Sequence, residues 1–316
     1  MLIPPEAGRT VASTNRAVSV IIPVYNGAAF LGEAIESVLR QTLPVQEILV
    51  IDDGSTDGSA EIARRYAGIR VLSFENAGLS TARNRGIAEA TSHWIALLDC
   101  DDVWVDDKIE RQMAKLAEHP TADVCVSGYQ LLQDGVLGKV MRAPENFGEL
   151  LERGTFSMPS CFVLRRSALL AVGGFDARVT SAEDWDCWLR LKRTGSTFVS
   201  CPEPLMHYRR HGNNLTSDAA FIYRGDLDIF DRFLLPKFPA PIRPLARWCR
   251  VSRLIADRAI VNRENGQRHL HLMLKSILMW PLGNWRRYKL AAHMALKRLG
   301  LVGRSQEQPA PAEPST

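Results

Sequence analysis

Four short apolar runs alternate with stretches of helical spacing between residues 18 and 99, and this alternation constrains the fold more than any other feature. The runs are VSVIIPVY (18–25), EILVIDD (47–53), IRVLSF (69–74) and HWIALLD (93–99). Continuous apolar runs of this length are typical of strands buried on both faces of a sheet. Helical spacing follows the first three runs. The order predicts an α/β fold with a mainly parallel sheet flanked by helices.

The helices between these runs have recognisable limits. Apolar residues from Phe30 to Leu39 predict the first helix, which ends at QTLP. Ser55 or Thr56 is expected to cap the second helix, SAEIARRYA (59–67). LSTARNRGIAEA (79–90) predicts the third helix.

Beyond about residue 120 the pattern becomes mixed, and it predicts the organisation of the rest of the chain. Strands are expected at ADVCVSGYQLL (122–132), SCFVLRR (160–166) and STFVSC (196–201), with a helix at EDWDCWLRLKRTG (183–195). We therefore predict a loose tail at 1–17, a domain at 18–220 with halves at 18–105 and 106–220, and a C-terminal helical appendage at 221–304. The low-complexity end at 305–316 is expected to be disordered.

Charge is distributed unevenly along this chain, whose formal net charge is +4. Residues 241–304 contain 14 Lys or Arg and 2 acidic residues, so the remainder is acidic. The 6 cysteines show no C-x-x-C spacing, which indicates neither a zinc site nor a disulfide framework and favours a cytoplasmic setting. No apolar run approaches the roughly 18 residues of a membrane span. The basic residues lack a nucleic-acid-reading motif, so no nucleic-acid partner is expected.

The fourth apolar run ends in three carboxylates, Asp99, Asp101 and Asp102. Such carboxylates repel one another unless a positive group lies between them, and hard oxygen ligands suit Mg²⁺ or Mn²⁺. A solvated acidic turn that caps the next helix is the alternative. Asp52 and Asp53 end the second run, and ligands of parallel sheets bind at the carboxyl ends of the strands. Both acidic groups should therefore face one crevice.

Five segments in order resemble the family 2 glycosyltransferases of GT-A fold: VSVIIPVYNGAAFLGEAIESVLRQT, ILVIDDGSTDGS, NAGLSTARNRGI, LLDCDDVW and GGFDARVTSAEDWDCWLRL. The resemblance covers about residues 18–212. It implies an inverting enzyme that moves a sugar from a nucleoside-diphosphate sugar to a hydroxyl of a glycan or lipid-linked glycan. A base deprotonates the acceptor, and a divalent metal neutralises the leaving diphosphate.

The resemblance also implies how the donor and the metal are held. Asp99 is expected to contact the nucleotide or ribose, Asp101 to be the principal metal ligand and Asp102 a helper, although a helix N-cap is preferred for Asp102. His211, in YRRHGNN, is expected to complete the metal shell, with a structural histidine as the alternative. The metal is Mn²⁺ or Mg²⁺.

The same family pattern places the nucleotide base and the diphosphate. Asp53 is expected to accept a hydrogen bond from a uracil-like ring, which indicates a UDP-sugar, with Asp52 beside it. Pro23, Tyr25 and Asn26 are expected to line this pocket, with a core aromatic as the alternative for Tyr25. Arg83 is expected to contact the diphosphate or base because a guanidinium matches phosphate geometry, with a solvated helix arginine as the alternative.

The segment EDWDCWLRL carries the expected catalytic carboxylates. Trp185, Trp188 and Leu189 share one helical face, so Glu183 and Asp184 fall in the first turn at the edge of the core. Acids there are often dipole partners only. The resemblance marks Asp184 as the general base and Glu183 as an acceptor-orienting residue.

Missing motifs narrow the function further. The Q-x-x-R-W motif of processive synthases is absent, with Pro244 in place of the glutamine of PLARW, so single-sugar addition is expected. Neither G-x-G-x-x-G after a strand nor G-x-x-x-x-G-K-[ST] occurs, which argues against dinucleotide and P-loop proteins. A non-catalytic nucleotide-sugar-binding or scaffold protein is the remaining alternative, and the intact Asp101 and Asp184 argue against it.

The basic C-terminal segment has apolar residues at helical spacing, followed by tryptophans and further basic residues. These are Leu270, Met273, Leu274, Ile277 and Leu278, then Trp280, Trp285, Arg286, Arg287 and Lys289. The pattern suits a helix that lies on an anionic membrane surface, and packing on the catalytic domain is the alternative. Membrane binding would indicate a lipid-linked glycan acceptor at the cytoplasmic face.

Overall fold

The computed structural model describes residues 16–153, 158–179, 181–212, 214, 219–264, 270–279, 291–292 and 295. The chain divides into two compact units, residues 1–217 and 218–316. The predicted loose tail, apart from residues 16 and 17, and the predicted disordered end at 305–316 lie outside the described residues.

The N-terminal half of the first unit is the predicted strand and helix alternation. The strands are β1 (Val18–Val24), β2 (Glu47–Asp52), β3 (Ile69–Ser73) and β4 (Trp94–Leu97). The helices between them are α2 (Ala28–Leu39), α3 (Ser59–Arg64) and α4 (Leu79–Glu89). These strands pair in parallel in the order β3-β2-β1-β4. Their carboxyl ends therefore lie at one edge, with Val24 of β1 opposite Asp52 of β2.

The C-terminal half of this unit extends the same sheet with both antiparallel and parallel pairs. Its elements are β5 (Val103–Trp104), α5 (Lys108–Glu118), β6 (Val124–Gln133), β7 (Val136–Met141), α6 (Phe147–Leu150), β8 (Phe162–Arg165), α7 (Arg166–Ala171), α8 (Glu183–Arg193) and β9 (Phe198–Arg210). The described strands form the order β3-β2-β1-β4-β8-β6-β9-β5, with β7 paired to β6. Strand β8 is antiparallel to both neighbours, β6 and β9 are parallel, and β5 is antiparallel to β9. The sheet is therefore mixed, and it is parallel from β3 to β4.

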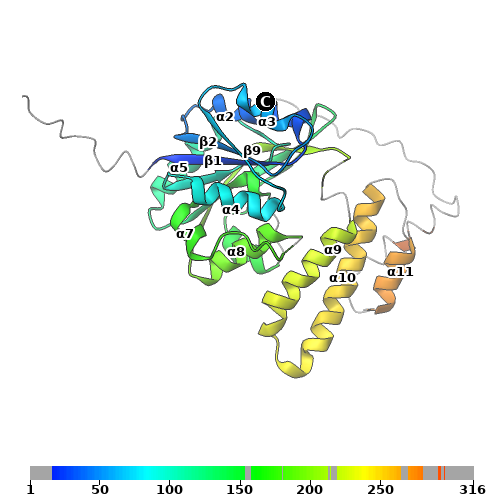
Figure 1. The fold of residues 1–316 in the computed structure, drawn as a ribbon. Coiled ribbons are helices and arrows are strands. Elements are labelled where there is room, and N and C mark those ends of the chain that lie inside the picture. Colours follow the sequence, from blue (N-terminus) through cyan, green and yellow to red (C-terminus); the bar gives the residue numbers. More distant parts are fainter. Residues whose placement is uncertain are drawn as a thin grey trace, which may run out of the picture. The chain divides into compact units, whose positions relative to one another are not determined.

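Helices cover both faces of the sheet, as the alternation predicts. Figure 1 shows α2 and α3 on one side and α4, α7 and α8 on the other. Strand β1 is buried along its whole length because both faces are covered. Helix α4 approaches β1 closely at Gly86, where an added Cβ would lie 2.5 Å from Cγ2 of Ile21. Only glycine allows this separation, and the contact fixes α4 against the sheet.

The second unit is helical in its described part, as predicted. It contains α9 (Ala219–Ile229), α10 (Arg243–Glu264) and α11 (Leu270–Met279). Helices α10 and α11 cross where Ser252 and Ser276 are fully buried, and each hydroxyl donates to the other residue's carbonyl oxygen, at 2.7 and 2.6 Å. Small polar side chains let the two backbones approach here. Within the described ranges, no helix has the length and apolar character that crossing a membrane requires.

The predicted cap of the second helix is wrong. Helix α3 begins at Ser59 after Gly58, and neither Ser55 nor Thr56 lies at its start. Both residues instead bind the loop that follows β1, through Asn26. A tertiary contact between two loops has replaced the local capping bond.

Candidate active site

The loops that follow β1 and β2 are tied together at the carboxyl edge of the sheet. Asn26 has φ 52°, a left-handed conformation that asparagine tolerates. Its Oδ1 accepts a hydrogen bond from the Thr56 amide at 2.8 Å, and its own amide donates to Ser55 Oγ at 3.0 Å. Tyr25 is 55% exposed, so the alternative of a core aromatic is wrong. Pro23 is buried within β1, directly beneath these loops.

Asp52 and Asp53 are both buried where β2 ends, yet they hold different segments. Asp52 Oδ1 accepts the Ser55 amide at 2.9 Å and closes the turn of its own loop. Asp53 accepts the amides of Ala77 and Gly78, at 3.0 and 2.8 Å, together with a guanidinium nitrogen of Arg85 at 3.2 Å. Asp53 thus fixes the entry to α4. Its expected hydrogen bond to a base stays a prediction.

Asp102 is the most buried carboxylate of the group that follows β4, at 1% exposure. It accepts hydrogen bonds from Ser160 Oγ at 2.6 Å and from the Arg209 amide at 3.2 Å. Burial first, and then Asp101 and Asp99, raise its pKa well above the ordinary value. Helix α5 begins at Lys108 after Asp107, so the preferred interpretation of Asp102 as a helix N-cap is wrong. The solvated-turn alternative also fails for this residue.

Asp101 and His211 meet as expected, although 110 positions separate them in the chain. His211 Nε2 lies 2.9 Å from Asp101 Oδ2, and the side-chain Nδ2 of Asn214 donates to the same oxygen at 3.2 Å. The imidazole stacks on Phe30 with ring centroids 4.7 Å apart, which fixes its orientation. Burial and the nearby Asp99 raise the pKa of Asp101, and His211 opposes the shift.

These side chains fit a Mg²⁺ or Mn²⁺ ion that also binds substrate phosphate. Among the residues that the structure describes, no group of three His, Cys, Asp or Glu side chains is arranged to hold a metal alone. Asp101 and His211 supply one oxygen and one nitrogen at one point. Magnesium sites commonly use one or two carboxylates and complete the shell with water and phosphate oxygens. Two protein ligands, which leave the rest of the shell to water and phosphate oxygens, match that arrangement.

Arg83 is 1% exposed, so the alternative of a solvated helix arginine is wrong. Its Nη2 lies 2.7 Å from Asp99 Oδ1, and its Nη1 lies 2.8 Å from Glu183 Oε1. The guanidinium also lies over the ring of Phe175, 5.2 Å from its centroid. Arg83 therefore links the carboxylate group after β4 to the start of α8. The expected diphosphate contact stays a prediction.

Glu183 and Asp184 open α8, as the helical face of tryptophans predicts. Asp184 is buried, and burial raises its pKa to about 7, with a further increase from Glu183. Arg83 and a 2.7 Å hydrogen bond from the Trp185 amide oppose that shift. Trp188, from the next turn, stacks on Phe162 of β8 at 4.2 Å between centroids and holds the helix on the sheet. A carboxylate that titrates near neutral pH suits a general base.

Three further residues build the site and were not singled out from the sequence: Ser160, Arg209 and Asn214. Arg209 donates from its Nε to the carbonyl oxygen of Asp101 at 2.9 Å and from its amide to Asp102. Arg209 is the penultimate residue of β9 and His211 follows its last residue, Arg210, so both reach the site from the end of this strand. Their closeness in sequence was a usable signal. Ser160 and Asn214 carry none.

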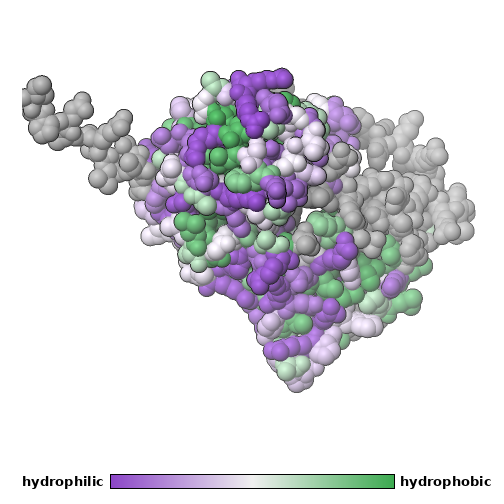
Figure 2. Space-filling view, in the orientation of Figure 1, coloured by the Kyte–Doolittle hydropathy of each residue, from purple (hydrophilic) through white to green (hydrophobic). Residues whose placement is uncertain are grey.

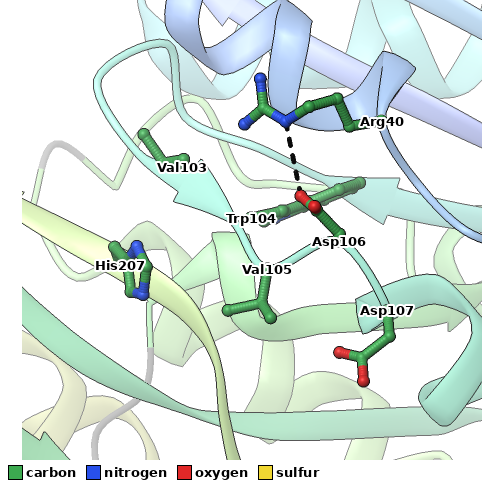
Figure 3. Close-up of a pocket in the computed structure, with 7 residues that line it drawn as sticks. All are labelled: Arg40, Val103, Trp104, Val105, Asp106, Asp107 and His207. Carbon is green, nitrogen blue, oxygen red and sulfur yellow. Dashed lines mark hydrogen bonds and ion pairs between the residues drawn. The ribbon is translucent and has the colours of Figure 1, made fainter.

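A surface cavity of about 590 Å³ lies apart from all the predicted site residues (Figure 3). It is lined by Arg40, Val103, Trp104, Val105, Asp106, Asp107 and His207. Arg40 Nε lies 3.5 Å from Asp106 Oδ1, the contact drawn in Figure 3. His207 of β9 faces this cavity, whereas His211 belongs to the acidic group. His207 and His211 therefore lie at two different sites, although they are close in sequence.

The mixed sheet with carboxylates at the ends of its parallel strands defines a GT-A-type protein, and solved structures share this fold. S. aureus TarS 1–349 in complex with UDP-GlcNAc aligns with a TM-score of 0.59 at 17% identity, over 91% of this chain and 93% of that chain. The mannosyltransferase PcManGT from Pyrobaculum calidifontis, in complex with GDP-Man and Mn²⁺, aligns with a TM-score of 0.56 at 18% identity, over 92% and 88%.

Sequence comparison gives the family. The profile described as Glycosyl transferase family 2 matches residues 19–173. The putative teichuronic acid biosynthesis glycosyltransferase TuaG of Bacillus subtilis (strain 168) is 32% identical over 211 residues, which are 64% of this chain and 82% of the relative. The chain belongs to glycosyltransferase family 2, whose members are enzymes that transfer a sugar from a nucleotide sugar.

Proposed function

We propose that this enzyme transfers one sugar, with inversion, from a UDP-sugar to a hydroxyl of a glycan or lipid-linked glycan. One observation carries the proposal: Asp184 is a buried carboxylate with its pKa raised to about 7, linked through Glu183 and Arg83 to Asp99. A base with this pKa is half ionised near neutral pH and accepts a proton from an attacking hydroxyl.

The reaction then needs one proton transfer and one displacement. Asp184 takes the proton of the acceptor hydroxyl while that oxygen forms a bond to the anomeric carbon from the face opposite the leaving group. The bond from the anomeric carbon to the diphosphate oxygen breaks, and nucleoside diphosphate leaves. Asp101 and His211 would hold a divalent cation that neutralises the charge developing on the diphosphate. Glu183 orients the acceptor.

The donor would bind across the ends of β1, β2 and β4. The exposed ring of Tyr25 and the Asn26 turn form one wall for the base, and Asp53 accepts a hydrogen bond from it beside Asp52 and Pro23. Asp99 would accept hydrogen bonds from the ribose hydroxyls. Both terminal nitrogens of Arg83 are paired with carboxylates, so a contact between Arg83 and the diphosphate would compete with these ion pairs.

A panel of donors tests the proposal. Thermal shift in the presence of Mn²⁺ should rank UDP-sugars above GDP-sugars, because binding to the folded protein alone raises the unfolding temperature. The same donors are then assayed for release of UDP with and without candidate acceptors. Preferential stabilisation by GDP-sugars would contradict the assignment of Asp53 to a uracil ring. Binding of UDP-sugars without any turnover would contradict the catalytic role of Asp184.

We expect each acceptor to receive one sugar. The support is the absent Q-x-x-R-W motif, since Pro244 replaces its glutamine. Mass spectrometry of products from one acceptor with excess donor should show a single added residue at every time point. Ladders of many sugars, formed on one acceptor before others react, would contradict it.

We further propose that the helical second unit contacts an anionic membrane. Side chains exposed on its surface are both apolar and basic (Figure 2). They comprise Leu245, Trp248, Leu274 and Leu278, at 46–82% exposure, with Arg243 and Lys275 beside them in sequence. Trp248 donates its indole hydrogen to the Met279 carbonyl, which joins the exposed residues of α10 to the end of α11. The tryptophans and basic residues expected at 280–289 lie outside the described residues.

Vesicle sedimentation should show binding to phosphatidylglycerol vesicles and little binding to phosphatidylcholine vesicles, weakened by salt because screening acts on surface charge. Trp248→Ala with Leu278→Ala should weaken the binding, since both remove exposed apolar area. Val136→Ala on β7, which removes a comparably exposed side chain from the first unit, should not. Equal behaviour of both vesicle types would leave the helices as a structural appendage. Binding would favour a lipid-linked acceptor and an enzyme that works at the cytoplasmic face.

A further inference from the structure

We propose that Arg83 is a positioning residue that holds the start of α8, and with it the catalytic carboxylate pair, against the donor side of the site. The inference rests on the proposed role of Asp184 as general base. It differs from the expected role of Arg83 as a diphosphate contact, and the two roles give different experimental results.

The burial of Arg83 supports a structural link rather than a ligand contact. A buried guanidinium needs charged partners, and at 1% exposure both terminal nitrogens of Arg83 lie within 2.8 Å of carboxylate oxygens, whereas its Nε has no hydrogen-bond partner among the described residues. One carboxylate, Asp99, follows β4, and the other, Glu183, begins α8. The planar fork of arginine can bridge two carboxylates in fixed directions, whereas lysine offers one point charge.

The backbone just before Glu183 gives a second, independent observation. Ala182 has φ 60°, a left-handed conformation that costs energy for any residue with a Cβ atom. Such conformations persist where surrounding contacts impose them, and they cluster at functional sites. The ion pair from Arg83 to Glu183 is immediately adjacent. Loss of this contact should therefore loosen the first turn of α8, which carries Asp184.

Helix α4 is suited to act as the fixed side of this link. Asn84 clamps the Phe175 backbone from both sides, accepting its amide at 2.8 Å and donating to its carbonyl at 2.7 Å. Arg85 binds Asp53, and Gly86 sets the helix against β1. Arg83, Asn84 and Arg85 are consecutive in α4 and bind three separate segments. These are the start of α8, the segment before it and the end of β2 at Asp53. The α8 start is the one that carries the base.

Arg83 and Glu183 carry opposite charges, so their removal should have opposite effects on the pKa of Asp184. The titratable and charged groups that act on Asp184 are Glu183 on its own helix, Arg83 from α4 and Asp99 after β4, with the Cys187 thiol one turn along. Arg83 lowers the pKa of Asp184, and Glu183 raises it. Arg83→Met should therefore raise that pKa, and Glu183→Gln should lower it.

The test uses full-length protein with four variants: Arg83→Met, Arg83→Lys, Glu183→Gln and the double variant Arg83→Met/Glu183→Gln. Three quantities are measured: the affinity for UDP with Mn²⁺ by calorimetry, amide hydrogen exchange of residues 183–193, and the pH dependence of UDP-GlcNAc hydrolysis. Arg83→Met leaves the Glu183 and Asp99 carboxylates without their arginine, and the double variant removes the charge of Glu183, so it keeps the test decisive if the single variant fails to fold. Arg165→Met, which breaks a half-buried pair with Asp123 elsewhere on the sheet, is the control.

We expect Arg83→Met to change UDP affinity by less than about threefold, a difference smaller than one lost charged contact. Amide hydrogen exchange in the first turn of α8 should become faster. The acid limb of the pH profile, where hydrolysis falls as Asp184 becomes protonated, should move to higher pH. The double variant should return the acid limb toward the wild-type position, and Arg83→Lys should give an intermediate result. The Arg165→Met control should change none of the three quantities.

A loss of UDP affinity of about tenfold or more, with unchanged α8 exchange and an unmoved acid limb, would make Arg83 a diphosphate contact and overturn the inference. Unchanged exchange and an unmoved limb with unchanged affinity would overturn it as well. If Asp184 is not the base, Asp184→Asn hydrolyses donor at the wild-type rate; that failure belongs to the proposed function, and the exchange measurement still decides whether Arg83 holds α8.

Discussion

Replacing Asp184 with asparagine should lower turnover by roughly 10²-fold or more, the usual scale of general base catalysis. Asparagine has nearly the same shape and can still accept the hydrogen bond from the Trp185 amide, but it cannot take a proton. UDP affinity should change little, since the proposed base acts on the acceptor. Steady-state kinetics and calorimetry with UDP and Mn²⁺ separate the two effects.

Asp186 provides the matched control for this substitution. It lies in the same turn of α8 and is also buried, but it pairs with Arg190 at 2.7 Å. Asp186→Asn should retain most of the turnover even if it lowers stability. Equal loss of UDP affinity and turnover in Asp184→Asn would instead place Asp184 in the donor site.

The raised pKa of Asp184 gives two pH dependences. Turnover should fall as pH drops below about 7, because the base becomes protonated. The folded protein binds this proton more tightly than the unfolded chain, so stability due to Asp184 declines as pH rises from 3.8 toward about 7. Asp184→Asn should lack both dependences. Urea unfolding of the two proteins across this range measures the second.

The second large effect concerns Asp101. Asp101→Ala, or EDTA treatment of the wild-type enzyme, should reduce transfer by about 10³-fold or more, because a divalent cation supplies several kcal/mol of charge stabilisation at a leaving diphosphate. The affinity of UDP should also lose its dependence on Mn²⁺ in the variant. Both rates and binding are measured with metal titrated back after chelation.

Asp106→Ala is the matched control, since Asp106 lies in the segment after the acidic group but its side chain is 60% exposed and pairs with Arg40. It should keep both activity and its metal dependence. Transfer at the wild-type rate by Asp101→Ala in the absence of added metal would refute the metal assignment. A smaller loss in His211→Ala would be consistent with a second ligand of the same ion.

The sequence predicted those parts of the fold that depend on local pattern. The four runs form β1 to β4 because continuous hydrophobicity is sufficient for a buried strand, and their order predicts that Asp52 and Asp99 share an edge. The meeting of Asp101 with His211 was predicted from family resemblance, since no local rule joins residues 110 positions apart. Strand β9 extends well beyond the predicted 196–201, because its second half is polar and is held by pairing with β6 and β5.

The errors share one cause, which is competition between local and tertiary hydrogen bonds. Ser55 and Asp102 have side chains suited to helix caps, and both instead bind groups distant in the chain: Asn26 for the first, Ser160 and Arg209 for the second. The burial of Arg83 was equally inaccessible, since its partners lie 16 and 100 positions away. Polar residues at a site are placed by the assembled fold, so their partners cannot be read from spacing alone.

The position of β9 sets an order in which the site can be assembled during synthesis. Among the described strands, β1, β2 and β3, whose loops we propose to bind the nucleotide, pair with one another and with β4 alone, so that half can form once about one hundred residues have emerged. Strand β5, which directly follows Asp102, pairs only with β9 among the described strands. The carboxylates after β4 thus gain Arg209 and His211 only when the chain has grown by a further 110 residues. Until then these acids remain solvated on an unfinished edge, and nascent chains should bind nucleotide before they bind metal.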